Sequence, residues 1–163
     1  ALRRSGNRRN GAGYRLWERG LAGWENFDEL RRRHLVPEPP YGQGAAGADA
    51  GAQAMTDVSD GLVADLGHLA AASKVTVEVS TAALAADHQV LAAAATALGA
   101  DAWAWVLGGG EDHALVATFP GAVPAGWRAI GRVADGPARV LVDGAPWDGD
   151  AGWQSYGSPA PLR

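Results

Sequence analysis

The stretch between residues 52 and 79 constrains the fold most, because the hydrophobic period changes within it. Residues 52–58 (AQAMTDV) form a short apolar run that predicts a strand. Residues 61–73 carry an apolar stripe at the spacing of one helical face, formed by Leu62, Leu66 and Leu69. Residues 75–79 (VTVEV) alternate with period two and predict a second strand. A helix between two strands indicates a layered α/β or α+β domain.

The remaining sequence continues this alternation of helices and strands. We expect helices over residues 14–33 and 81–98, and strands over residues 103–107, 113–119, 130–133 and 139–142. Residues 34–54 contain the motif PEPP at 37–40, so we expect an extended connection there. The compact domain is expected to begin close to this connection. The interleaved elements indicate the α+β or the α/β class.

Composition and charge exclude several classes of protein. The chain has 163 residues and no cysteine, which excludes disulfide scaffolds and cysteine nucleophiles and agrees with a reducing cytoplasm. No apolar run approaches the length of a membrane span, so we expect no membrane partner. Residues 1–33 carry nine arginines against four acids, whereas the rest carry five basic and fourteen acidic side chains. This acidic body argues against a nucleic-acid partner and leaves room for a metal ion that bridges carboxylates to an anion.

The motif MTDVSDGL, at residues 55–62, is the first candidate site. Asp57 and Asp60 flank the hydroxyl of Ser59 where a strand gives way to a helix. Carboxylates at this spacing can hold a hard cation such as Mg²⁺, and the start of a helix favours an anion. The alternative is purely structural, because serine and aspartate are also ordinary helix N-caps.

Two further motifs are candidates for ligand binding. Glu111 follows a run of glycines at 108–110, which would let a ligand or another backbone approach closely. The alternative is a glycine-rich bulge with solvated acids. Trp153 and Tyr156, in the segment GWQSY at 152–156, could stack on a planar ring or pack on the protein's own core.

These motifs, in this order, resemble the C-terminal half of the thiamine-monophosphate kinase family, in the aminoimidazole-ribonucleotide-synthase superfamily. The resemblance covers about residues 34–157, and its most specific parts are AMTDVSDGLVADLGHLA at 54–70 and GGEDH at 109–113. It implies the α+β class, with an α/β sandwich domain over residues 34–163 whose mixed sheet is flanked by helices. Residues 1–33 would then be the residual connection from a missing N-terminal domain.

The resemblance also implies an activity, which is ATP-dependent phosphorylation of thiamine monophosphate to thiamine diphosphate. Asp57 and Asp60 would be Mg²⁺ ligands and Ser59 would contact the nucleotide. Glu111 would contact the thiamine substrate, and Trp153 or Tyr156 would pack on its ring. Members of the family are cytoplasmic homodimers whose N-terminal domain supplies further aspartates, so we expect this chain to be inactive alone.

Three other interpretations stay open. The chain could belong to another ATP-using branch of the superfamily, such as selenophosphate synthetase or the hydrogenase-maturation protein, although the latter branch relies on a C-terminal cysteine. It could be a non-catalytic module that docks a partner through residues 1–33. Nucleic-acid binding by the arginine-rich start is the third, and the acidic body opposes it.

Overall fold

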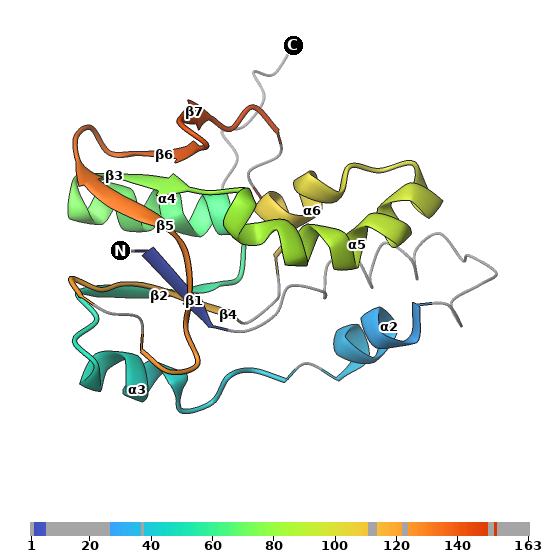
Figure 1. Ribbon diagram of the computed structural model, residues 1–163, viewed down its shortest axis with the longest axis horizontal. Coiled ribbons are helices and arrows are strands. Elements are labelled where there is room, and N and C mark those ends of the chain that lie inside the picture. Colours follow the sequence, from blue (N-terminus) through green and yellow to red (C-terminus); the bar gives the residue numbers. More distant parts are fainter. Residues whose placement is uncertain are drawn as a thin grey trace, which may run out of the picture.

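A seven-stranded mixed sheet organises the part of the chain that the computed structural model describes, which is residues 2–5, 27–36, 38–110, 114–121, 124–149 and 152 (Figure 1). The strands are β1 Leu2–Ser5, β2 Ala54–Val58, β3 Val75–Val79, β4 Ala114–Thr118, β5 Arg128–Asp135, β6 Arg139–Val142 and β7 Ala145–Pro146. Their order in the sheet is β2-β4-β1-β5-β3-β6-β7. Strands β3 and β6 pair in parallel, and every other pair in this sheet is antiparallel.

The helices cover both faces of this sheet (Figure 1). They are α2 Asp28–Leu35, α3 Gln43–Asp49, α4 Leu62–Ser73, the 3₁₀ turn η2 Ala82–Leu84, α5 Ala85–Leu98 and α6 Ala102–Gly108. Helix α4 contacts β2, β3 and β6 and also packs against α6, which in turn packs against α5. Helix α3 contacts β4. None of these helices is long and apolar enough to cross a membrane.

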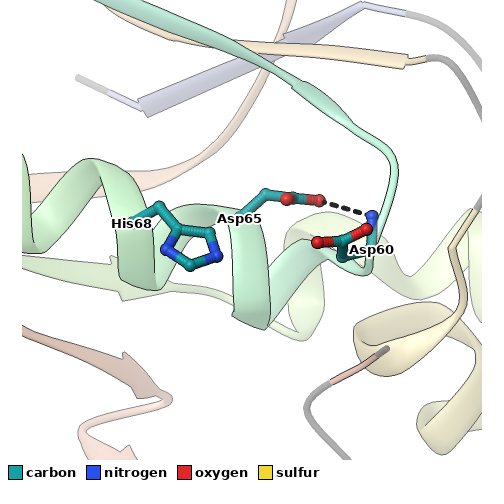
Figure 2. Close-up of side chains that lie close together, drawn as sticks. All are labelled: Asp60, Asp65 and His68. Carbon is teal, nitrogen blue, oxygen red and sulfur yellow. Dashed lines mark hydrogen bonds between the residues drawn. The ribbon is translucent and has the colours of Figure 1, made fainter. Parts of the chain in front are cut away.

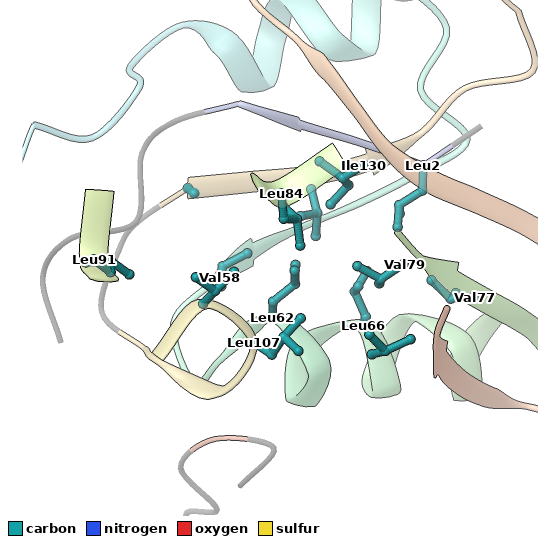
Figure 3. Packing of buried hydrophobic residues seen from close by; sticks show 14 of the residues in the cluster. Leu2, Val58, Leu62, Leu66, Val77, Val79, Leu84, Leu91, Leu107 and Ile130 are labelled. Carbon is teal, nitrogen blue, oxygen red and sulfur yellow. The ribbon is translucent and has the colours of Figure 1, made fainter. Parts of the chain in front are cut away.

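The hydrophobic core is divided by the sheet into two clusters of unequal size. Side chains alternate between the faces of a strand, so Ala114 and Val116 of β4 join the large cluster, whereas Leu115 and Ala117 join the small one. The large cluster lies between the sheet and α4, where Leu62 and Leu66 are fully buried (Figure 3). Burial of each such leucine stabilises the fold by about 1.5–3 kcal/mol.

The central strand–helix–strand prediction is confirmed. Strand β2, helix α4 and strand β3 match the expected ranges closely, and β5 and β6 contain the two later predicted strands. The predicted helix over 81–98 is divided into η2 and α5, and it ends at Gly99, whose φ of 62° suits a glycine C-cap. The α+β class with a mixed sheet flanked by helices is therefore correct.

The strand predicted over residues 103–107 is wrong, because this segment forms helix α6. Asp101 caps the helix, since its carboxylate accepts a hydrogen bond from the backbone N–H of Trp103 at 2.8 Å. Val106 and Leu107 are buried on the face that meets α4 and α5. The hydrophobic period of a short apolar run does not distinguish a buried helix from a strand. The N-cap residue Asp101 is the local signal that favours the helix.

The extended connection expected over residues 34–54 also needs correction, because α3 occupies its middle. The prolines exclude a helix only near position 40, and the chain turns into α3 at Gly42, where φ is 85°. Gly47 then lies against Met55 and Trp127, where an added Cβ would come within 2.9 Å of both side chains. This close packing fixes α3 on the small cluster.

Residues 1–33 are predicted to be the residual connection from a missing N-terminal domain, and the described part of this segment includes Leu2–Ser5, which form strand β1 of the sheet. Strand β1 pairs with β4 on one side and β5 on the other, and Leu2 is fully buried. The sequence LRRS shows little alternation, so the strand is fixed by its neighbours in the sheet. Of the helix expected over 14–33, the described part is the start of α2, and residues 6–26 lie outside the described residues.

Candidate functional site

The candidate site lies where strand β2 passes into helix α4. Residues 59–61 form this junction, which we call the β2–α4 turn, and Gly61 adopts a φ of 145° that favours glycine. Ser59 in the turn is exposed and Asp60 is half-buried, while Asp57 is exposed near the end of β2. The structure therefore presents the hydroxyl and the two carboxylates of the predicted motif near the surface.

Asp65, in the first turn of α4, holds the β2–α4 turn from within. Its side chain is only 5% exposed, and its Oδ2 atom accepts a hydrogen bond from the backbone N–H of Asp60 at 3.1 Å (Figure 2). The same atom accepts the backbone N–H of Gly61, also at 3.1 Å. The backbone N–H of Asp65 in turn donates to the carbonyl of Gly61 at 2.9 Å. This reciprocal pairing ties the start of the helix to the turn.

Burial raises the pKa of the Asp65 carboxyl above its ordinary value. The two backbone N–H groups oppose this shift because they stabilise the charged form, whereas the nearby carboxylates of Asp60 and Asp57 add to it. The site is thus a concentration of negative charge that a cation would stabilise.

Among the described residues, one group of acidic and histidine side chains is close enough to share a cation. Asp60, Asp65 and His68 each offer a ligand atom, and these atoms lie within 4.8 Å of one another (Figure 2). Asp57 does not belong to this group. Motif spacing pointed to Asp57 and Asp60 but missed Asp65, although a side chain four residues after Gly61 is one helical turn away and faces the turn.

The other two predicted motifs meet the same turn through their glycines. A Cβ added to Gly110 would lie 2.3 Å from the carbonyl oxygen of Ser59 and 3.1 Å from that of Asp60. A Cβ added to Gly152 would lie 2.2 Å from the carbonyl oxygen of Asp60. Both positions therefore need glycine, and the backbones of Gly110 and Gly152 pack directly on the β2–α4 turn.

Three of the predicted site residues follow these glycines in the sequence and lie outside the described residues. They are Glu111, Trp153 and Tyr156. Their contacts with substrate stay predictions. What the structure adds is the position of Gly110 and Gly152, from which these segments continue.

The segment leading to Gly110 is supported by two helices. Gly109 donates its backbone N–H to the carbonyl of Trp105 at 3.1 Å, and an added Cβ there would lie 2.4 Å from the same oxygen. Trp103, at the start of α6, stacks on His88 of α5 with ring centroids 4.5 Å apart. Helix α6 is thus packed against α5, and its C-terminal end leads directly to Gly110, which contacts the β2–α4 turn.

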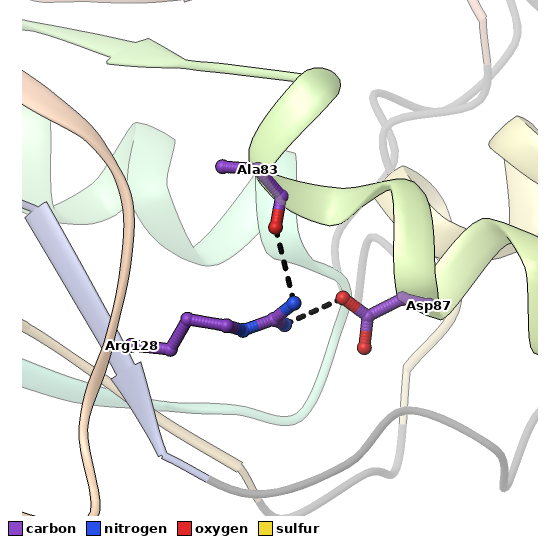
Figure 4. A network of polar contacts seen from close by, with 3 residues as sticks. All are labelled: Ala83, Asp87 and Arg128. Carbon is purple, nitrogen blue, oxygen red and sulfur yellow. Dashed lines mark hydrogen bonds and ion pairs between the residues drawn. The ribbon is translucent and has the colours of Figure 1, made fainter.

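Helix α5 is itself fastened to the sheet by a polar network. Arg128 of β5 donates hydrogen bonds to the Asp87 carboxylate and, at 3.0 Å, to the carbonyl of Ala83 (Figure 4). The Asp87 side chain is 5% exposed, so its charge is paired in a poorly solvated position. This network connects the sheet to the helices that support the site.

Comparison with curated proteins gives thiamine-monophosphate kinases, although no protein-family model matches the chain. The thiamine-monophosphate kinase of Mycobacterium tuberculosis is 70% identical over 151 residues, which is 93% of this chain and 44% of that protein. That of Corynebacterium glutamicum is 40% identical over 134 residues, which is 81% of this chain and 40% of that protein. The chain therefore spans less than half the length of these relatives.

Comparison with solved structures agrees. Thiamine monophosphate kinase from Aquifex aeolicus has 31% identity and a TM-score of 0.76 over 90% of this chain and 51% of that one. A structure of AaThiL complexed with AMPPCP and TMP has 30% identity and a TM-score of 0.79 over 96% of this chain and 51% of that one. The hydrogenase maturation protein HypE, at 16% identity and a TM-score of 0.59, shares the fold alone.

Proposed function

Since the chain is homologous to thiamine-monophosphate kinases along 93% of its length, we propose that it forms part of such a kinase. The whole protein would transfer a phosphoryl group from ATP to thiamine monophosphate and release thiamine diphosphate. The observation that carries this proposal beyond homology is the convergence of Gly110 and Gly152 on the β2–α4 turn. One glycine from each of the two other motifs that the resemblance links to the active site thus packs on the turn that carries Asp60.

Metal binding is the chemistry that this turn supports best. The turn offers the side-chain oxygens of Ser59 and Asp60, and Asp57 offers its carboxylate from the end of β2; oxygen atoms are the ligands that Mg²⁺ prefers. When bound, Mg²⁺ supplies positive charge to phosphate oxygens. Asp57 and Asp60 would hold the ion at the end of β2, and Ser59 would contact the nucleotide.

The chain's own residues would act by positioning and charge. Both reactants are polyanions, so the kinase has to bring mutually repelling phosphates together and keep them in line. The packed backbones of Gly110 and Gly152 restrict how the turn can move, and the segments that carry Glu111 and Trp153 follow these glycines in the sequence. Those segments would hold the thiamine substrate, with Tyr156 as the alternative ring contact.

The remaining length of the kinase would come from a domain that this chain does not contain. The curated relatives are more than twice as long as the matched region, and an N-terminal domain with further acidic ligands would account for the difference. We therefore propose that the chain alone has no turnover, that it works with this domain in a homodimer, and that it acts in the cytoplasm.

A chimeric enzyme tests the function directly. This chain would replace the matching 44% of the Mycobacterium tuberculosis kinase, whose 70% identity favours a correct fold. We expect the chimera to convert thiamine monophosphate to thiamine diphosphate with ATP and Mg²⁺, and the isolated chain to show no turnover. A chimera that unfolds as cooperatively as the parent kinase and yet is inactive would contradict the proposal.

Two substitutions in the same chimera test the metal assignment. Asp57→Asn and Asp60→Asn keep the side-chain shape but remove the charge, so each should raise the Mg²⁺ concentration required for half-maximal rate. The thermal midpoint should stay unchanged, because Asp57 is exposed and Asp60 is half-buried. An unchanged Mg²⁺ requirement in both variants would remove the metal role.

Calorimetry distinguishes the kinase from the alternative of a non-catalytic docking module. A purely docking module would give no heat with Mg-ATP or thiamine monophosphate.

A further inference from the structure

The structure assigns to Asp65 the role of a positioning residue, which holds the β2–α4 turn so that Asp60 presents its carboxylate to a cation. The part of this inference that concerns the cation rests on the proposed function. The part that concerns the turn rests on hydrogen bonds alone. Asp65 acts in it through the backbone of Asp60 and Gly61, without contacting a substrate.

The first support is the direction of the hydrogen bonds. A helix leaves its first backbone N–H groups without partners within the helix, and side chains usually cap them from before the helix. Asp65 does the reverse, because its Oδ2 reaches back from the first turn of α4 to the N–H groups of Asp60 and Gly61. Asp60 is therefore fixed through its own backbone.

The second support is that the rest of the turn is already restrained. The carbonyl oxygens of Ser59 and Asp60 pack against the backbones of Gly110 and Gly152. The carbonyl of Gly61 accepts the N–H of Asp65. The Asp65 carboxylate binds the two N–H groups that point to the other side, so both sides of the turn are held.

Asp65 could instead be a metal ligand, together with Asp60 and His68, because the three offer atoms within 4.8 Å. Three observations favour the positioning role. The Asp65 Oδ2 atom already accepts two hydrogen bonds, and its side chain is 5% exposed, which leaves little space for the water molecules that Mg²⁺ retains. His68 would supply a nitrogen, whereas Mg²⁺ prefers oxygen.

The decisive comparison is between Asp65→Asn and Asp65→Ala in the isolated chain. Asparagine keeps an oxygen at the same place and can still accept both N–H groups, but it carries no charge. Alanine removes the acceptor. If the alanine variant does not fold, Asp65→Ser replaces it, because the serine oxygen is one atom closer to the backbone and does not reach the turn.

Amide hydrogen exchange, measured by NMR at Asp60 and Gly61, is the first readout. We expect the alanine or serine variant to exchange about tenfold faster at these two amides, and the asparagine variant to stay within about twofold of the original chain. The amide of Val77 in β3 reports any global change and serves as the internal control. Unchanged exchange at Asp60 and Gly61 in the alanine variant would overturn the inference.

Titration with Mn²⁺ alone, followed by paramagnetic broadening, is the second readout. We expect weaker Mn²⁺ binding in the alanine variant, and binding within about threefold of the original chain in Asp65→Asn and in His68→Gln. Equal losses in Asp65→Asn and Asp65→Ala would show that Asp65 is a ligand and overturn the positioning role. If the original chain binds no Mn²⁺, the metal part of the proposed function fails, while the exchange pattern still decides how Asp65 holds the turn.

Discussion

The backbone of Gly110 lies so close to Ser59 that a methyl group on Gly110 would come within 2.3 Å of the serine carbonyl oxygen. Real Cβ atoms do not approach an oxygen this closely, so one of the two backbones would have to move. Since Ser59 belongs to the β2–α4 turn, this contact couples the glycine segment to the candidate site.

Gly110→Ala should destabilise the chain and displace the turn. The obstacle is a backbone oxygen, which has no rotamer to change, so we expect a loss of about 1–3 kcal/mol in the free energy of unfolding. Denaturant unfolding measures this loss, and the amide shifts of Ser59 and Asp60 report the displacement. The matched control is Gly67→Ala in α4, where nothing lies within 4 Å of an added Cβ. Alanine should stabilise that helix by about 0.5–1 kcal/mol, and equal effects at the two glycines would refute the steric explanation.

Leu66→Ala should be among the most damaging changes in the core. The side chain is fully buried between α4 and the sheet, and its removal leaves a cavity (Figure 3). The expected loss is about 2–5 kcal/mol, measured by thermal or denaturant unfolding. Val90→Ala in α5 is the control, because Val90 is exposed and should change the stability by less than about 0.5 kcal/mol.

Two arginines of β5 offer a matched test of charge burial. Arg128, 40% exposed, pairs with the buried Asp87, whereas Arg132, 73% exposed, pairs with Glu78. Arg128→Gln should cost about 1–3 kcal/mol, because it removes the cation from a poorly solvated carboxylate. Arg132→Gln should cost less than about 1 kcal/mol, since solvent already screens that pair. Urea unfolding of both variants is the measurement, and an equal cost would show that burial of Asp87 is unimportant.

The raised pKa of Asp65 predicts a pH dependence of stability. A raised pKa means that the folded chain holds the proton more tightly than the unfolded chain does. This stabilising contribution is complete below the ordinary aspartate pKa and is lost as pH rises through the folded-state pKa. Asp65→Asn removes the titration, so the variant should gain stability relative to the original chain as pH rises above the ordinary aspartate pKa of about 4. Unfolding at a series of pH values in the presence of EDTA measures this difference, and a difference that does not change with pH would contradict the shift.

The sequence predicted the elements whose signals are local. The stripe of Leu62, Leu66 and Leu69 and the alternation of residues 75–79 were sufficient for α4 and β3, because each pattern spans its whole element. Helix α6 was missed because Trp103 to Leu107 are apolar on every side, and only the cap at Asp101 separates helix from strand. Strand β1 was missed because pairing with distant strands, and not its own pattern, determines it.

The candidate site was predicted in part. Asp57, Ser59 and Asp60 are arranged around one turn as their spacing indicated, but their roles stay predictions. The place where the three motifs meet depends on long-range contacts of Gly110 and Gly152, which no local pattern encodes. A helix that begins at Leu62 places Asp65 in its first turn, four residues after Gly61. This spacing is a local signal that the Asp65 side chain lies near the backbone before the helix.

The position of β1 has a consequence for anyone who shortens this chain at its amino end. Judged from the sequence alone, deletion of residues 1–27, up to the start of α2, would seem harmless, because this segment is rich in arginine and glycine. The deletion would remove β1, which is an interior strand of the sheet. The backbone N–H and carbonyl groups of β4 and β5 that pair with β1 would then have no partner strand. Open edges of this kind recruit other chains, so the shortened product would be expected to precipitate or to borrow a strand from a neighbour.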